Sequence, residues 1–293
     1  MLARAPTRQT STSSSRTTGA RSARRHGSIG SLRRRRDPYT RLASSEVSVA
    51  IALHRVSAGY KSPVLHDIDL EVGNEVVAVV GRSGSGKTTL LRLIAGLLEP
   101  TAGTVDLLGV APAVARRRKR IGFVAQDARL HPWRTVRENV TLPLEVNRTA
   151  RTNGHIGPDE WVARMGLSDA IDAYPHQLSG GMRQRVALAR SLVIDPEVLL
   201  MDEPLASLDE LTREDLRDEL LHLWEGRARS VVYVTHDIEE AVLLADRVVV
   251  IGGTRPGRVR GEVRITLARP RTKALRREPR FHDLVEEVRG HLQ

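Results

Sequence analysis

The sequence predicts an α/β fold built on parallel strands, and three observations support this prediction. Short apolar runs of strand length recur along the chain, for example at 76–80 and 198–201. A longer stretch with apolar residues near helical spacing, 210–224, follows the second of these runs. The first run leads through the glycine-rich segment 81–88 into a helix-like run at 90–98. Strands that alternate with helices in this way are typical of a parallel sheet covered by helices.

The remaining elements follow in order along the chain. We expect, in turn, antiparallel strands within 47–71 with Tyr60 in a turn, strands at 104–108 and 121–124, helices within about 135–177 around a polar loop at 148–158, strands at 231–234, 248–251 and 258–265, and a closing helix at 281–292. The strand at 231–234 continues the parallel core. Within the amphipathic stretch before it, we expect core contacts rather than a ligand site from Leu211, Leu216, Leu220, Leu221 and Trp224.

The segment 81–88 reads G-x-x-x-x-G-K-T and stands between a predicted strand and a predicted helix. Its glycines permit tight turns that point backbone N–H groups inward, and the helix adds the positive end of its dipole. Lys87 can reach the β- and γ-phosphates of a nucleotide, and Thr88 offers a hydroxyl to Mg²⁺. The flanking strand and helix disfavour a plain glycine-rich turn. We therefore expect nucleotide contacts from Gly81, Ser83, Gly84, Ser85, Gly86, Lys87, Thr88 and Thr89.

A second segment with the character of an anion site lies about ninety residues further on. Ser179 is a natural N-cap for the helix-like stretch that runs to Leu192. Gly180 and Gly181 leave backbone N–H groups open at the helix N-terminus, where the dipole favours negative charge. An ordinary helix cap is the simpler interpretation of this segment by itself. The chain therefore carries two candidate phosphate-binding surfaces.

Two adjacent carboxylates, Asp202 and Glu203, follow a predicted strand directly, and the alternation of faces along a strand sends their side chains different ways. His236 follows the next apolar run closely, and Gln126 follows an earlier one. Taken one at a time, an acidic pair could begin a solvated loop, a histidine could be structural, and a lone glutamine proves nothing. Tyr60 could pack in the core, as aromatic rings usually do. The order and spacing of these residues relative to the other motifs favour a functional role instead.

The order and spacing of these segments resemble those of the ATP-binding cassette (ABC) ATPases. The segment 178–185, Leu-Ser-Gly-Gly-Met-Arg-Gln-Arg, is similar to their signature motif, and Pro204 followed by 207–209 is similar to their D-loop. The resemblance runs from residue 49 to 292. It implies a P-loop NTPase (RecA-like) core with an antiparallel β subdomain and an inserted α-helical subdomain at about 128–190.

The resemblance also implies a role for each candidate residue, with ATP and Mg²⁺ as the ligands. Glu203 orients and deprotonates the attacking water, His236 contacts the γ-phosphate, and Gln126 senses the metal and the water. The implied metal ligands are Thr88, Gln126 and Asp202. The resemblance thus assigns catalysis to Glu203, His236 and Gln126.

Nucleotide contacts outside the phosphate loop are also implied by the resemblance. Tyr60 stacks on adenine, a role that needs a flat polarisable ring. From the partner subunit of a homodimer, contacts to the same ATP come from Ser179, Gly180, Gly181 and Asp209. A single set of motifs therefore implies a homodimer that closes through a nucleotide sandwich.

Several segments resemble one group of these proteins, the ATP-binding subunits of nitrate, sulfonate and taurine importers; these segments are 127–136, 138–140, 208–213, 235–242 and 255–259. Ala125 and Leu205-Ala206 depart from the group's usual pattern, outside the catalytic set. The resemblance implies an ATP-hydrolysing subunit that energises uptake of a small solute through integral-membrane permease subunits, and works with a solute-binding protein indirectly. It places the protein at the cytoplasmic face of the cell membrane as a peripheral subunit, with 132–140 in the groove that meets the permease.

The net charge of +11 resides almost entirely in residues 1–45, which hold eleven arginines, one acid (Asp37) and no apolar periodicity. We expect a disordered basic leader there, before an ABC ATPase domain at 46–292. A dispensable leader or a misassigned start is favoured over a transit peptide or a segment that touches anionic lipid or RNA.

The alternative function is a soluble ABC ATPase that acts on nucleic acid or ribosomes, with the basic segment as its anchor. Among the proteins that this alternative resembles, DNA-repair members carry long coiled-coil insertions and translation-associated members usually carry two tandem cassettes. Both features are missing from the sequence, so nucleic acid is an unlikely partner. The chain has no cysteine, which excludes disulfides and thiolate metal sites. It also has no run of about 18 to 20 apolar residues, the length that a membrane span needs.

Overall fold

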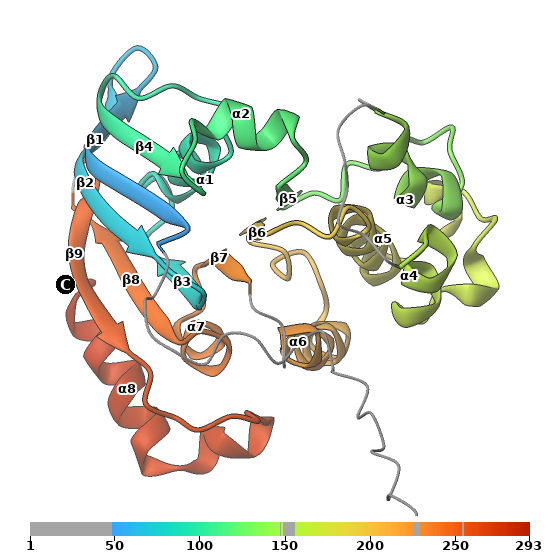
Figure 1. Ribbon diagram of the computed structural model, residues 1–293. Coiled ribbons are helices and arrows are strands. Elements are labelled where there is room, and N and C mark those ends of the chain that lie inside the picture. Colours follow the sequence, from blue (N-terminus) through green and yellow to red (C-terminus); the bar gives the residue numbers. More distant parts are fainter. Residues whose placement is uncertain (1–48, 147, 149–155, 225–228, 254) are drawn as a thin grey trace, which may run out of the picture. The chain divides into compact units, whose positions relative to one another are not determined.

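The computed structural model describes residues 49–146, 148, 156–224, 229–253 and 255–293, all within the compact unit Glu46–Gln293 (Figure 1). The basic leader predicted at 1–45 and most of the polar loop predicted at 148–158 lie outside the described residues. The strands are β1 (Ile51–Gly59), β2 (Pro63–Val72), β3 (Val76–Val80), β4 (Ala102–Leu107), β5 (Ile121–Val124), β6 (Val198–Asp202), β7 (Ser230–Thr235), β8 (Arg247–Gly252) and β9 (Arg258–Arg264).

Helices alternate with these strands, as the sequence predicts. They are α1 (Lys87–Ile94), α2 (Pro112–Arg117), α3 (Val136–Glu145), α4 (Pro158–Arg164), α5 (Gly180–Leu192), α6 (Glu210–Trp224), α7 (Ile238–Leu244) and α8 (Pro279–Gly290), with short 3₁₀ turns η1 (Ser168–Ala170), η2 (Pro175–Gln177) and η3 (Lys273–Arg277). None of the helices in the described ranges is long and apolar enough to cross a membrane.

The described strands form two sheets. The larger has the order β5-β6-β7-β3-β8-β9 and is parallel except at β9, which runs antiparallel to β8 (Figure 1). The smaller has the order β2-β1-β4 and is antiparallel, with Tyr60 in the turn between β1 and β2. The fold is therefore a P-loop NTPase core with an antiparallel β subdomain, as expected.

The core consists of two apolar clusters, and β3 contributes to both because its side chains alternate between the faces of the sheet. Val76, Ala78 and Val80 pack with residues of α5 to α8, whereas Val77 and Val79 pack with α1 and the antiparallel sheet. A parallel strand that is covered on both faces needs a continuous apolar run, which explains the Val-rich sequence of β3. The carboxyl end of β3 is thereby fixed where the phosphate loop begins.

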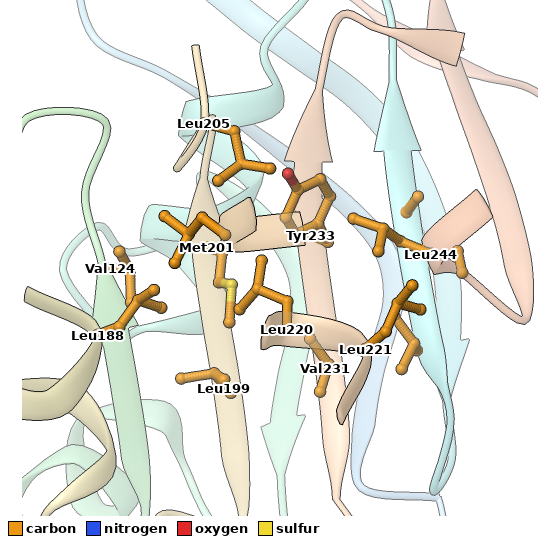
Figure 2. Close-up of a cluster of buried hydrophobic side chains, with 14 of the residues drawn as sticks. Val124, Leu188, Leu199, Met201, Leu205, Leu220, Leu221, Val231, Tyr233 and Leu244 are labelled. Atoms are coloured by element: carbon orange, nitrogen blue, oxygen red, sulfur yellow. The ribbon is translucent and has the colours of Figure 1, made fainter. Parts of the chain in front are cut away.

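A cluster of buried side chains joins strands β5, β6 and β7 to the helices on one face of the sheet (Figure 2). The labelled members include Leu188 of α5, Met201 of β6 and Leu220 of α6. Leu216, Leu220 and Leu221 are buried as predicted, and Trp224 packs at the margin. The prediction for Leu211 is wrong, because this side chain is 77% exposed in the first turn of α6. Helical spacing marks the apolar face but not where the helix leaves the core.

Helices α3, α4 and α5 form the inserted helical part of the fold (Figure 1). α3 begins with a capping box in which Thr135 accepts a hydrogen bond from the N–H of Glu138 and Glu138 accepts one from the N–H of Thr135. Asn139 is fully buried, and its amide donates to the carbonyls of His131, Arg134 and Thr135. These bonds fix the segment that leads from β5 into α3. The domain limits 46–292 and 128–190 stay predictions.

Candidate nucleotide site

The loop between β3 and α1 has a shape that requires its glycines. Gly84 and Gly86 have φ of 80° and 104°, in the left-handed region that favours glycine. At Gly81 a Cβ atom would lie 2.2 Å from the carbonyl oxygen of Ile251 in β8. Ser85 is buried, and its Oγ has no hydrogen-bond partner in the part of the chain that the structure describes. An orphaned hydroxyl inside a glycine-rich cradle fits a phosphate ligand.

Lys87 is the first residue of α1 and is buried. Its Nζ donates to the carbonyl oxygens of Gly81 at 2.8 Å and Arg82 at 3.2 Å, and lies 3.9 Å from Glu203 Oε1. Burial lowers the pKa of the Lys87 ammonium, and the carboxylates of Glu203 and Asp202 oppose that shift. The ammonium therefore stands between the phosphate loop and the acidic end of β6.

Asp202 ends β6 in a buried position, and its Oδ1 accepts a hydrogen bond from Thr88 Oγ1 at 3.1 Å. Burial raises the pKa of the Asp202 carboxyl, while the hydrogen bond from Thr88 opposes the rise. A hydroxyl and a carboxylate side by side are the hard oxygen donors that Mg²⁺ takes, and this cation usually adds substrate phosphates and water to one or two protein ligands. The donor set of Thr88 and Asp202 fits that cation.

Glu203 follows β6 with a φ of 45°, which is unusual for a residue with a side chain and is a conformation found at functional sites. Its N–H donates to the carbonyl oxygen of Val234 in the neighbouring β7 at 3.0 Å. Its Oε2 lies 3.2 Å from Nδ1 of His236, which is exposed. Glu203 and His236 line a cavity of about 60 Å³. The structure therefore brings together the predicted pair at the ends of two adjacent parallel strands.

Two predicted residues lie at the margin of this arrangement. Gln126 is exposed just after β5, and the pairing of Val124 with Met201 places it beside the acidic end of β6. Tyr60 is 64% exposed, so the alternative of a core tyrosine is wrong. Its hydroxyl accepts a hydrogen bond from Arg92 of α1 at 3.0 Å. Both side chains are open to a ligand. Thr89, the second residue after Lys87, is buried in α1.

The segment around Ser179 forms a separate surface, and Figure 1 shows α5 apart from α1. Ser179 is exposed and caps α5, because its Oγ accepts a hydrogen bond from the N–H of Met182 at 3.2 Å. Gly180 is exposed, whereas Gly181 is buried so closely that a Cβ there would lie 2.3 Å from Cγ2 of Thr212. Within one chain the two predicted phosphate surfaces do not form one pocket.

Asp209 belongs to the same outer surface and is exposed. Its Oδ1 accepts a hydrogen bond from the N–H of Thr212 at 3.1 Å, and this bond holds the pKa of the Asp209 carboxyl below its usual value. Thr212 thus contacts both Gly181 and Asp209, a link that the sequence analysis missed because the residue carries no local pattern. Arg190 was missed for the same reason, although it donates from α5 to the carbonyls of Ala128 and Arg129.

A glycine-rich loop between a central parallel strand and a helix, together with two adjacent carboxylates at the end of another parallel strand, makes this molecule a P-loop NTPase. The family model described as ABC transporter matches residues 65–206, and the chain belongs to this family. It is an ABC-type ATPase.

Curated relatives and solved structures agree with this assignment. The chain is 45% identical over 249 residues to the aliphatic sulfonates import ATP-binding protein SsuB of Ralstonia nicotianae, covering 85% of this chain and 82% of that protein. It is 41% identical over 253 residues to the nitrate import ATP-binding protein NrtD of a Synechocystis species, covering 82% and 93%. A dimeric ATP-binding cassette in a post-hydrolysis state, bound to ADP and Pi, matches with a TM-score of 0.65 at 32% identity and covers 74% of this chain and all of that one.

Proposed function

We propose that this protein is the ATP-binding and ATP-hydrolysing subunit of an importer for a small solute of the nitrate, sulfonate or taurine kind. The observation that carries the ATPase part is the position of Lys87. Its ammonium touches the carbonyls of the phosphate loop and lies 3.9 Å from Glu203, so the phosphate-binding group and the acidic group share one site.

Binding begins with an exchange of partners at this lysine. Lys87 gives up the carbonyls of Gly81 and Arg82 for phosphate oxygens, which are charged and therefore stronger acceptors. Backbone N–H groups of 83–89 and the Ser85 hydroxyl meet the remaining phosphate oxygens. Tyr60, which is exposed, stacks on the adenine.

Hydrolysis needs an oriented water and neutralised charge more than covalent chemistry. Thr88, Asp202 and Gln126 would hold Mg²⁺, which would supply charge neutralisation for the phosphates. Glu203 orients the attacking water and accepts its proton, and His236 donates a hydrogen bond to the γ-phosphate. The contact between Glu203 Oε2 and His236 Nδ1 keeps these two groups on the same side of the nucleotide.

A second copy of the chain completes the site. Ser179, Gly180 and Asp209 are exposed on a surface apart from the phosphate loop, and this exposure supports a contact with the loop of a partner subunit. ATP between the two surfaces then closes a homodimer, and hydrolysis releases it. The dimeric state of the matched cassette structure supports this arrangement.

Import is supported by the names of the relatives and by an exposed aromatic side chain beside α3. Trp133 is 71% exposed, and its ring lies 5.2 Å from that of His131 in the segment that Asn139 fixes. An exposed large apolar residue on a fixed segment suits a protein contact. We assign this surface to the permease subunits, which places the protein as a peripheral subunit at the cytoplasmic face of the membrane, with a solute-binding protein on the far side of the permease.

Co-purification from native membranes tests the proposal. The tagged chain is captured from detergent-solubilised membranes, and mass spectrometry is expected to find a permease with several membrane spans. Trp133→Asp is expected to lose that permease and retain ATP binding. Leu97→Asp, which changes another exposed apolar residue (53% exposed), is the matched control and is expected to keep it. Ribosomal or DNA-bound partners without a permease would contradict the proposal.

A further inference from the structure

The turn between β8 and β9 lies directly on the phosphate loop. A Cβ atom on Gly257 would come within 2.1 Å of the carbonyl oxygen of Ser85, so only glycine fits at this contact. The backbone of Gly257 also pairs with β2, because its N–H donates to Val64 at 2.8 Å and its carbonyl accepts from His66 at 3.0 Å. The turn is therefore held between β2 and the loop that receives phosphate.

Arg255, two residues before Gly257 in this turn, reaches the same loop. Its Nε lies 3.4 Å from the carbonyl oxygen of Gly84, and its guanidinium is 3.6 Å from the position of a Cβ on Gly84. The residue is exposed, so its head group can move without breaking the fold. Gly84 itself has a left-handed φ, and it lies in the part of the loop where nucleotide contacts are expected.

The charge of Arg255 has no acidic partner within the described ranges. This contrasts with Arg247 on β8, which pairs with Glu75 and Glu262, and with Arg269, which pairs with Asp246. A cation without a carboxylate, placed over a loop that binds an anion, contributes more attraction to the ligand than a neutralised one does.

We propose that Arg255 is a further phosphate-binding residue of the nucleotide site, supplied by the β8–β9 turn. In the structure its guanidinium rests on the carbonyl of Gly84. When a nucleoside triphosphate enters, the same group turns from that neutral acceptor to a charged phosphate oxygen, which is the stronger acceptor. The inference rests on the proposed ATP-binding function and adds a residue to it.

Equilibrium binding of ATP to the nucleotide-free full chain, followed with a fluorescent ATP analogue and competition by ATP and ADP, tests this role. At low salt Arg255→Gln is expected to weaken ATP binding roughly tenfold, the effect of removing one close cation from a multiply charged ligand. The loss is expected to be smaller for ADP, which carries less charge, and to shrink as salt is added. Arg255→Lys, which keeps the charge, is expected to retain most of the affinity.

Arg264→Gln is the matched control, because it removes the same charge from an exposed position at the opposite end of β9. Its affinity for ATP is expected to stay within twofold of the parent's. Arg255→Gln with unchanged affinity at low salt would overturn the inference, and so would a loss that is equal at all salt concentrations and shared by Arg255→Lys, since that would indicate a structural role. A parent chain that binds neither nucleotide would instead overturn the proposed function.

Discussion

The two proposed phosphate-binding surfaces of this chain differ in how far the chain itself completes them. The base of the phosphate loop is packed against its own fold, with Lys87 buried and with close contacts from Ile251 in β8 and Gly257 in the β8–β9 turn. The segment at the start of α5 faces outward, and Ser179 uses its side chain to cap its own helix. The phosphate loop thus forms part of a pocket within one chain, whereas the start of α5 is exposed at the surface.

This difference predicts that the two surfaces influence different properties, the affinity for nucleotide in one case and the rate of ATP hydrolysis in the other. Because the phosphate loop is assembled within one chain, a single subunit has the groups that hold a nucleotide. In the proposed dimer, the surface at Ser179 would add groups only when a second subunit approaches, so its contribution would depend on association. Substitutions in the phosphate-loop site should therefore act within a single subunit. Substitutions at the start of α5 should instead alter ATP hydrolysis, which follows dimer formation.

The largest expected effect comes from Glu203→Gln, which changes the pocket without removing its phosphate contacts. Glutamine cannot take a proton from water, so steady ATP hydrolysis is expected to fall by about 10²–10⁴-fold. ATP binding is expected to persist and an ATP-bound dimer to accumulate, measured by an ATPase assay and by size-exclusion chromatography. The control is Glu286→Gln, an exposed carboxylate of α8. A Glu203→Gln variant that hydrolyses ATP like the parent would show that the assigned role is wrong.

An intermediate effect is expected from Gly181→Ala on the outward-facing surface. The new methyl group would lie 2.3 Å from Cγ2 of Thr212, so either the Thr212 side chain or the start of α5 must shift. We expect ATP hydrolysis to fall by roughly 10- to 100-fold, the range for a misplaced binding group, while ATP binding by dilute monomers is unchanged.

Adding Thr212→Ala removes the atom that Gly181→Ala meets, and the double variant is expected to regain much of the lost hydrolysis. Gly290→Ala, where the described atoms leave the position open, is the control and should behave like the parent. If the Gly181→Ala monomer also loses ATP binding, the start of α5 influences the phosphate-loop site within one chain, and the proposed independence of the two surfaces is wrong.

The smallest expected effect is on stability, from Asp202→Asn in the pocket. Burial raises the pKa of Asp202 in the folded chain above its unfolded value, so the charged carboxylate destabilises the native state above the folded pKa, and this cost disappears below the ordinary value of 3.8. Without nucleotide, Asp202→Asn is therefore expected to be slightly more stable than the parent at pH 7.5, and the gain should shrink as the pH falls toward 4. Urea unfolding at both pH values measures it. A difference in unfolding free energy between variant and parent that is equal at both pH values would refute the electrostatic explanation.

The sequence predicts the pocket better than it predicts the contacts that hold it. Apolar runs mark β3, β6 and β7, and because parallel strands end at the same edge of a sheet, Glu203 and His236 meet as expected. The same reasoning cannot find Arg190, whose hydrogen bonds reach residues 61 and 62 positions away. Nor can it find the packing of Thr212 on Gly181, because such contacts depend on how two helices approach and leave no periodic trace.

Helix α5 has a mechanical consequence, because its C-terminal half is anchored while Ser179 and Gly180 at its start are exposed. The exposed edge at Ser179 lies at the start of the helix, and Leu188 is buried in the core beside the sheet. Near the C-terminal end of the helix, Arg190 donates hydrogen bonds to the carbonyls of residues 128 and 129. A 13-residue helix is about 20 Å long and does not bend easily. Any movement of the 128–129 segment that preserves those hydrogen bonds must turn the helix as a rigid rod about its buried middle. In the dimer proposed above, a displacement of the 128–129 segment would therefore also move the opposite end of α5, which would face the ATP held by the second subunit.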